Sequence, residues 1–426
     1  MRLAALGCVI SMPGAASAIN CGIPGFPFTI TDEKLGSGAD ALGMKVLSNT
    51  ATGERVEIIW ESGGNTERVR LRSPTTGLLR DVLQTNNNNA TAVRLNQHYA
   101  GNILLPFANR IRNGTYNFFG RAYLLPRNEN TPGVRSDALH GFLFNRTLAV
   151  RDAGCTNATG VPSVYVTLGY RFDGSQQGSS ATPGWPFKLD TALTYALSAG
   201  SLSIITRATS LETSQALPWF NGWHPYFAVG SVAQARVEFD SCRSSMQVLT
   251  MAPSPAHHGA LSPAQARVEL DSCRSDKSTT GAQWSHITMG EGAPRAGDLI
   301  PTGEATPWTR FDGSTPIGGD EERPSYMDDE FKSTLAQKAL STAAVCGPYI
   351  RHRIHDAGGD KSTIVLWADR QHAVTQIFTG SQELWGWRAI ALEPMSALAD
   401  AYNNGDGLTV LWPGETFEGI FGTAIE

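Results

Sequence analysis

Short segments in which apolar and polar residues alternate recur along the chain, with turn-forming residues between them. The clearest are residues 56–60, 163–172, 194–209, 362–368 and 373–380. A period of two residues is that of a β-strand with one buried face. The pattern therefore predicts an all-β fold, a large antiparallel β-sandwich with few short helices.

Helical periodicity is scarce by comparison. Residues 329–344, DEFKSTLAQKALSTAA, are the one candidate for an amphipathic helix, and a loop fits them equally well. No glycine-rich phosphate loop follows a predicted strand and opens a helix. The pattern therefore indicates no nucleotide cofactor.

One short unit occurs twice: residues 233–244 read AQARVEFDSCRS and residues 264–275 read AQARVELDSCRS. A near-identical pair favours a local duplication or a misassigned splice junction over a solenoid. Only one copy can occupy a given place in a sheet, so we expect the segment around 233–275 to be partly looped out. Between the copies, His257 and His258 resemble a metal pair. Their side chains would point to opposite faces of an extended chain with no third ligand nearby, so we expect no metal site.

The N-terminal residues 1–18 resemble a secretion signal, with Arg2 before an apolar stretch and a small-x-small ending at Ala18. A ragged N-terminus is the alternative. Four glycosylation sequons, at Asn89, Asn113, Asn145 and Asn157, also favour export. We expect a secreted, extracellular protein whose residues 19–426 form a single domain.

Cysteine usage fits an oxidising compartment. Without the leader, the chain carries an odd number of cysteines: Cys21, Cys155, Cys242, Cys273 and Cys346. Each repeat copy supplies one, so setting one copy aside leaves four cysteines and three open pairings. The spare thiol is then Cys242 or Cys273.

Charge excludes two classes of partner. The chain has 34 Lys and Arg against 39 Asp and Glu, a net charge of −5, and no long basic block. We therefore expect neither nucleic-acid binding nor a membrane-binding patch. No apolar run is long enough to span a bilayer. The pattern makes no prediction of oligomeric state.

Five blocks, in the same order along the chain, resemble those of the aldose 1-epimerase (mutarotase) family. They are GNILLPFANRIRNGTYNFFGRAYLLPRNE from residue 101, DALHGFLFNRT from 137, GWHPYF from 222, IPTGEATP from 300 and ALEPMSALADAYNNGDGLTVLWPGETFEGIFG from 391. The resemblance extends from about Gly25 to the C-terminus, and the last block is the most specific. It implies a large β-sandwich that interconverts the α and β anomers of free aldoses, glucose or galactose among them, without a cofactor.

The resemblance also implies a catalytic pair. His224 of HPYF matches the general acid of the family, and Glu393 of LEP matches its general base. Opening a cyclic hemiacetal requires removal of the anomeric hydroxyl proton while the ring oxygen receives another, so an acid and a base must act together. A charged neighbour would hold the imidazole protonated near neutral pH, and Arg110 would help Glu393 to stay ionised.

Three further positions match residues that hold the substrate. They are Arg110 of ANRI, His140 of LHG and Asp328 of MDDEF, with Asp329 the next candidate. We also expect aromatic residues around His224 to offer an apolar wall to the sugar: Trp219, Trp223, Tyr226 and Phe227.

Each residue also has a structural explanation. His224 could be a core histidine, His140 could cap a turn, Arg110 could pair with a structural carboxylate, and Glu393 could be a strand-end charge. Asp328, Asp329 and Glu330 could form a solvated acidic surface. At the level of function, the alternatives are a catalytically inactive sugar-binding β-sandwich and a glycoside-cleaving or lyase enzyme.

Overall fold

The structure is a computed structural model that describes most of the chain. The described residues are 19–20, 26–95, 98–131, 135–157, 161–178, 181–239, 284–290, 299–308, 310–319, 325–333, 349–355, 362–380 and 385–426. The proposed leader, His257, His258 and the second repeat copy lie outside these ranges.

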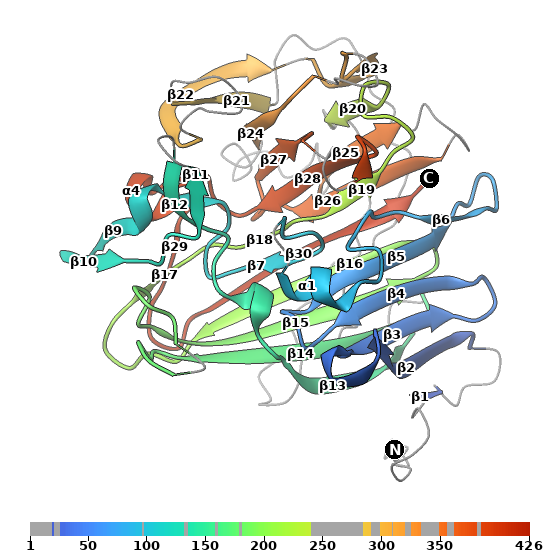
Figure 1. Cartoon of the computed structure of the whole chain (residues 1–426), viewed down its shortest axis with the longest axis horizontal. Helices are drawn as coiled ribbons and strands as arrows, with labels where there is room; N and C mark the ends of the chain where they lie inside the picture. Colours follow the sequence, from blue (N-terminus) through green and yellow to red (C-terminus); the bar gives the residue numbers. More distant parts are fainter. Residues whose placement is uncertain are drawn as a thin grey trace, which may run out of the picture.

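Antiparallel sheets make up the fold, and the largest has nine strands (Figure 1). In spatial order its strands are β13 (Ala149–Thr156), β14 (Ser163–Asp173), β15 (Lys188–Ser198), β16 (Ser201–Ser210), β30 (Thr416–Ile425), β26 (Thr363–Asp369), β25 (Tyr349–His355), β20 (Arg236–Phe239) and β23 (Asp312–Pro316). The prediction of an all-β antiparallel sandwich is confirmed.

Two more large sheets complete the architecture. The six-stranded sheet follows chain order: β1 (Ile19–Asn20), β2 (Phe28–Leu35), β3 (Leu42–Asn49), β4 (Glu54–Ile59), β5 (Asn65–Arg72) and β6 (Leu79–Asp81). The eight-stranded sheet has the order β22 (Pro301–Trp308), β21 (Trp284–Met289), β24 (Asp328–Ser333), β27 (Val374–Phe378), β28 (Ala389–Met395), β18 (Gly222–Trp223) and β7 (Ile103–Leu104), with β19 (Tyr226–Ala228) pairing with β28.

Small elements connect the large sheets. The short strands are β8 (Arg110–Ile111), β9 (Thr115–Phe118), β10 (Arg121–Leu124), β11 (Glu129–Thr131), β12 (Arg135–Leu139), β17 (Leu217–Trp219) and β29 (Thr409–Leu411). The helices are α1 (Ala90–Leu95) and α4 (Ala401–Asn404), with 3-10 turns at Gly38–Asp40, Arg112–Gly114 and Leu143–Asn145. Among the described residues, no helix is long and apolar enough to cross a membrane.

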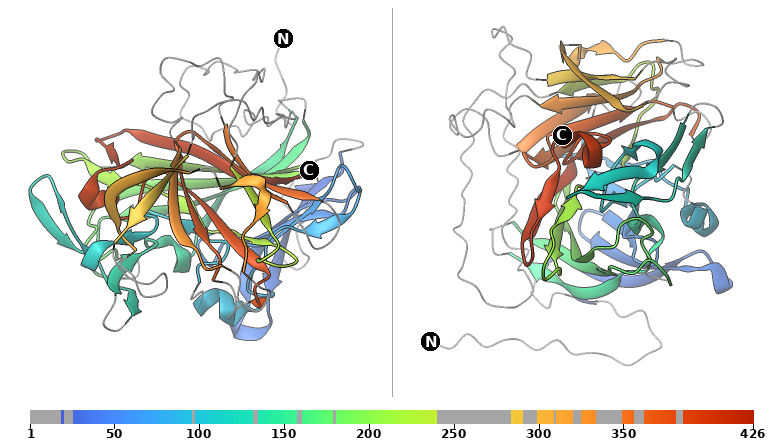
Figure 2. Two further views of the ribbon diagram at one scale, coloured as in Figure 1. Left: turned by 90° about the horizontal axis from the view of Figure 1, so that it is seen from above. Right: turned by 90° about the vertical axis from the view of Figure 1, so that its left-hand side faces the viewer.

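The two smaller large sheets pack against different parts of the nine-stranded sheet (Figure 2). At one end, β2 and β3 contact β14, and β3 also contacts β15. Towards the other end, Phe239 of β20 contacts Trp284 of β21 and Phe331 of β24. Between them, Trp223 of β18 stacks on Phe421 of β30, with ring centroids 5.9 Å apart. One hydrophobic cluster therefore runs through the three sheets.

Most of the predicted strands are found. Residues 56–60, 163–172, 362–368 and 373–380 correspond to β4, β14, β26 and β27. Residues 194–209 are a hairpin rather than one strand, because Gly200 turns the chain with a φ of 71° between β15 and β16.

Two predictions concern the segments around the repeat and the candidate helix. The first repeat copy supplies β20, between β25 and β23, so this copy occupies the place in the sheet. The helix prediction for residues 329–344 is wrong for its described part, because residues 329–333 belong to β24 and pair with β21 and β27. The rest of that segment lies outside the described residues.

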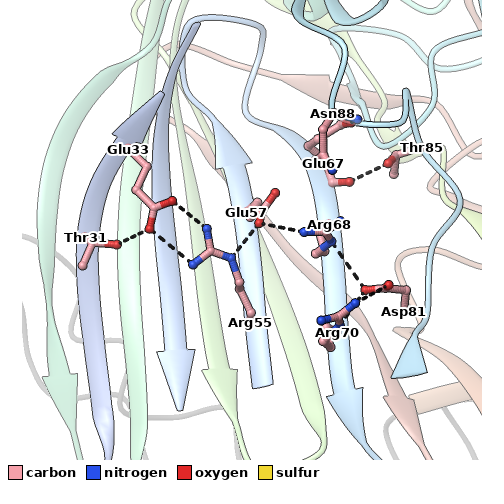
Figure 3. A network of polar contacts seen from close by, with 10 residues as sticks. All are labelled: Thr31, Glu33, Arg55, Glu57, Glu67, Arg68, Arg70, Asp81, Thr85 and Asn88. Atoms are coloured by element: carbon pink, nitrogen blue, oxygen red, sulfur yellow. Dashed lines mark hydrogen bonds and ion pairs between the residues drawn. The ribbon is translucent and has the colours of Figure 1, made fainter. Parts of the chain in front are cut away.

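A ladder of charged side chains crosses the partly exposed face of the six-stranded sheet (Figure 3). Carboxylates and guanidinium groups alternate along it, and each ion contacts an opposite charge on a neighbouring position: Glu33, Arg55, Glu57, Arg68, Asp81 and Arg70. The three carboxylates and three guanidinium groups of this ladder therefore balance one another in charge.

Candidate active site

The structure brings the five predicted site residues together from five separate segments. Arg110 begins β8, His140 directly follows β12, and His224 lies between β18 and β19. Asp328 begins β24, and Glu393 lies within β28. The eight-stranded sheet supplies the acidic residues, while connecting segments supply the basic ones.

Two residues in left-handed backbone conformations form the turn that carries His140. His140 has a φ of 60° and Gly141 a φ of 69°, both in the left-handed region. A Cβ added at Gly141 would lie 2.1 Å from the backbone oxygen of Leu105. Only glycine fits there, so His140 is carried on a turn pressed against Leu105.

His224 and Glu393 form the centre of the site. Nε2 of His224 lies 3.2 Å from Oε1 of Glu393, and the two side chains are only 7% and 3% exposed. The ring of Tyr226 stacks on the imidazole with centroids 4.9 Å apart. Within the described part of the chain, Nδ1 of His224 and Oε2 of Glu393 are buried without a hydrogen-bond partner. These atoms are the ones left to contact a ligand.

Burial decides the protonation of this pair. It lowers the pKa of His224 to about 3, and the nearby charges of His98 and Arg110 act in the same direction. It also raises the pKa of Glu393 well above its ordinary value, against the opposing charge of Arg110. The expectation of a protonated His224 beside an ionised Glu393 is therefore wrong for the resting site, because desolvation outweighs the charge of Arg110.

His140 presents its other nitrogen to the site. Its Nδ1 accepts a hydrogen bond from the backbone N–H of Asn109 at 3.0 Å, so the ring proton lies on Nε2. Its ring meets those of Tyr99 and His224 edge-on. Burial lowers the pKa of His140 well below its ordinary value, with the charges of His224 and Arg110 adding to the effect. His140 is thus a neutral donor.

This tautomer bears on metal binding. One potential ligand atom each from His140, His224 and Glu393 lies within 4.8 Å of the others. A metal would need a free lone pair from each imidazole, and that of His140 is directed at the backbone of Asn109. The donor set does not fit a metal ion unless this hydrogen bond breaks.

Arg110 lies in a fork of acceptors. Its Nε and Nη2 donate to the two carboxylate oxygens of Glu129 at 2.7 and 2.9 Å. Its Nη1 donates to Oδ1 of Asn109 at 3.1 Å, and Nη2 lies 3.9 Å from Asp328. Burial alone would lower the pKa of Arg110, but the carboxylates of Asp328 and Glu129 outweigh it and raise it. Sequence reasoning missed Glu129, the last residue of the first block, although a buried arginine requires such a partner.

Alternation along β24 separates the three adjacent acidic residues. Asp328 faces Arg110 and accepts a hydrogen bond from Nε2 of Gln376 at 2.6 Å. Asp329 faces the other way, with its carboxylate 2.9 Å from His286. Glu330 returns to the first face and is fully buried, so the expectation of a solvated acidic surface is wrong at this position. The structure places Asp328, and not Asp329, in the site.

The predicted aromatic wall is mostly wrong. Trp219, Trp223 and Phe227 are 0% exposed and belong to the hydrophobic core, so they cannot contact a sugar. Tyr226 does lie against the site through its stacking on His224. Tyr99, which the sequence reasoning did not single out, lies against His140.

A cavity of about 420 Å³ opens on the same sheet beside the site. Its lining comes from β21, β22, β24 and the segment around α4, and includes Thr302, Lys332, Leu398 and Asp406. None of the five predicted site residues lines it. The IPTGEATP block therefore borders this cavity and not the His224–Glu393 pair.

Comparison with known proteins supports one family. Residues 54–256 match the aldose 1-epimerase family model. Arg110, His140 and His224 lie inside the match, whereas Asp328 and Glu393 follow it. The matched residues are just under half of the chain, so the match shows a similarity to this family.

The related proteins are distant. YihR of Escherichia coli strain K12 is 29% identical over 128 residues, which are 30% of this chain and 36% of YihR. The chain thus matches about a third of the length of this curated relative. A galactose mutarotase-like protein of Clostridium acetobutylicum has a TM-score of 0.61 at 17% identity, over 90% of this chain and 95% of that chain. Galactose 1-epimerase of Lactobacillus acidophilus NCFM has a TM-score of 0.59 at 14% identity, over 97% and 99%. Both likenesses show the fold.

Proposed function

We propose that this protein is a mutarotase, which interconverts the α and β anomers of a free hexose by general acid and base catalysis. The observation that carries the proposal is the contact of 3.2 Å between His224 Nε2 and Glu393 Oε1, in a buried site that also holds Arg110, His140 and Asp328. A buried carboxyl beside a buried imidazole is a pair suited to exchange a proton.

The pair performs the reaction with one proton. The proton that the resting pair holds on Glu393 first passes to His224 across the 3.2 Å contact. Ionised Glu393 then removes the anomeric hydroxyl proton while protonated His224 delivers its proton to the ring oxygen. Opening leaves Glu393 protonated and His224 neutral, the state that burial favours in the resting site. After rotation about the C1–C2 bond, closure reverses both transfers and yields either anomer. No electron is transferred, so the reaction needs no redox cofactor.

The other three residues hold the sugar. Arg110 and the Nε2–H of His140 are hydrogen-bond donors and the Asp328 carboxylate is an acceptor, so the site offers both kinds of partner that sugar hydroxyls need. Tyr226 and Tyr99 supply apolar surface next to the two histidines. This set suits a neutral hexose of the glucose or galactose type.

Polarimetry of freshly dissolved α-glucose and α-galactose tests the proposal. The protein should raise the rate of approach to anomeric equilibrium above the spontaneous rate, and His224→Ala should remove the gain. His372→Ala is a matched control, because His372 is also buried but pairs with Asp369 and Asn221. An unchanged spontaneous rate with wild-type protein would indicate a sugar binder, and release of reducing ends from oligosaccharides would indicate glycoside cleavage.

We also propose that the protein is secreted and glycosylated, with residues 1–18 removed. The asparagines of all four sequons are exposed, which is compatible with glycans: Asn89, Asn113, Asn145 and Asn157. Cys155 of β13 is disulfide-bonded, as an oxidising compartment permits. Asn113 and Asn145 lie close in sequence to site residues, yet their side chains face solvent and not the buried pair.

A further inference from the structure

Every polar atom of Asn109, the residue before Arg110, makes a hydrogen bond. Asn109 is 1% exposed, with a φ of 53°. Its backbone N–H donates to Nδ1 of His140, and its carbonyl accepts the His140 N–H, both at 3.0 Å. Its side-chain Nδ2 donates to Glu330 at 2.8 Å and to Gln376 at 3.1 Å, while Oδ1 accepts from Arg110 at 3.1 Å. Asn109 thus contacts two substrate-holding residues directly.

Glu330 holds the Asn109 side chain by accepting its hydrogen bond. Its two carboxylate oxygens accept the backbone N–H of Ala399 at 2.9 and 3.2 Å, and it is 0% exposed. Gln376, the second acceptor of Asn109, donates in turn to Asp328 at 2.6 Å. A continuous chain of hydrogen bonds therefore runs from Glu330 through Asn109 to the substrate-facing carboxylate.

We propose that the Asn109 side chain, anchored by Glu330, is a positioning residue that aims Arg110 and Asp328 at the sugar. Nε and Nη2 of Arg110 donate to Glu129, and Nη1 donates to Asn109. Asn109 therefore sets the direction of Nη1. This inference rests on the proposed mutarotase function and adds residues that do not touch the substrate.

Glu330 lies among charged side chains. Arg110 attracts its carboxylate, whereas Asp328 and Glu393 repel it. Burial raises the pKa of Glu330 to about 8, and the hydrogen bonds from Ala399 and Asn109 oppose that rise. Oε1 of Glu330 accepts from both Asn109 and Ala399, and Oε2 also accepts from Ala399, so one side chain holds both groups at once.

Asn109→Gly tests the side chain alone, because glycine tolerates the positive φ and keeps both backbone bonds to His140. We expect KM to rise about tenfold or more and kcat to stay within about threefold, since a hydrogen bond to a charged group is lost. Asn88→Gly is the matched control: Asn88 also has a positive φ, 56°, but its side chain is exposed. In an Arg110→Lys background, Asn109→Gly should raise KM by a smaller factor than it does in otherwise wild-type protein. Control-like kinetics, or losses that multiply, would overturn the proposal.

Glu330→Gln gives a second variant with the same volume. We expect Glu330→Gln to raise KM, as Asn109→Gly does. The KM of the double variant should be about that of the single variant with the higher KM. A wild-type KM in Glu330→Gln would contradict the anchoring role of Glu330.

A readout without turnover separates the two proposals. The Arg110 Nε–H signal in ¹H–¹⁵N NMR, assigned through its loss in Arg110→Lys, reports the guanidinium directly. It should shift in Asn109→Gly and Glu330→Gln but not in Asn88→Gly. Wild-type protein that fails to accelerate anomerisation while this signal shifts would refute the mutarotase and keep the positioning role. An unshifted signal would refute the positioning role itself.

Discussion

Replacing Glu393 by glutamine removes the proton acceptor of the pair and almost nothing else. Glutamine has the same shape, and its amide can still contact Nε2 of His224 across the 3.2 Å gap. An amide neither takes nor gives a proton in the working pH range. The substitution therefore tests chemistry separately from packing.

The size of the effect follows from the geometry. A positioned acid or base contributes about 10²- to 10⁴-fold to a rate, which is about 3–5.5 kcal/mol of transition-state free energy. We expect Glu393→Gln to lose kcat in that range. KM should change less than about threefold, because Arg110, His140 and Asp328 still hold the sugar.

Stability should move in the opposite direction. Burial raises the folded-state pKa of Glu393 above its unfolded value, so the folded chain binds more protons than the unfolded chain once the pH exceeds about 4.5. The Glu393 carboxyl therefore costs stability that grows as the pH rises from 4.5 towards the folded pKa. Glu393→Gln should melt at or above the wild-type temperature at pH 8, with a smaller difference at pH 4.5.

Polarimetry with the spontaneous rate subtracted gives kcat and KM, and calorimetry gives the melting temperature. Glu57→Gln, a buried glutamate in the ladder of the six-stranded sheet, controls for loss of a buried carboxyl as such. A kcat within twofold of wild type would refute the role of Glu393 as base. A large loss of melting temperature would attribute the lost activity to misfolding.

Three further outcomes are expected. Because the pKa of His224 is lowered to about 3, activity should not fall with an apparent pKa near 6.5 as the pH drops from 7 to 5, and a titration near 6.5 in a pH–rate profile would contradict this. Glu129→Gln weakens the fork that holds Arg110 and should raise KM about tenfold, measured beside the remote Asp81→Asn as control. Intact mass of the protein from a eukaryotic host should show a chain beginning at Ile19 with added hexose and N-acetylhexosamine, whereas an unmodified chain beginning at Met1 would refute secretion.

Strand periodicity predicted the fold, and short motifs selected five candidate residues that lie together in the structure, because periodicity and motifs are both local properties. A strand with one buried face must alternate, and β14 does so along most of its length. His224 and Glu393 were identified from their flanking residues by resemblance. Neither step required knowledge of distant contacts.

The features that could not be predicted depend on distant contacts. The acidic run at 328–330 resembles a surface, yet pairing of β24 with β27 buries Glu330 while Asp329 stays partly exposed. The protonation of His224 and Glu393 depends on how far burial outweighs the charge of Arg110. Asn109 carries no motif signal of its own beyond its place beside Arg110.

The most direct test of the account compares His224→Ala, Glu393→Gln and the double variant in one polarimetric assay. Two groups that pass a single proton work as one unit, so the double variant should be no slower than the worse single variant, within about threefold. Rate losses that multiply in the double variant would show that the two residues act independently, and the proton-sharing pair would not exist.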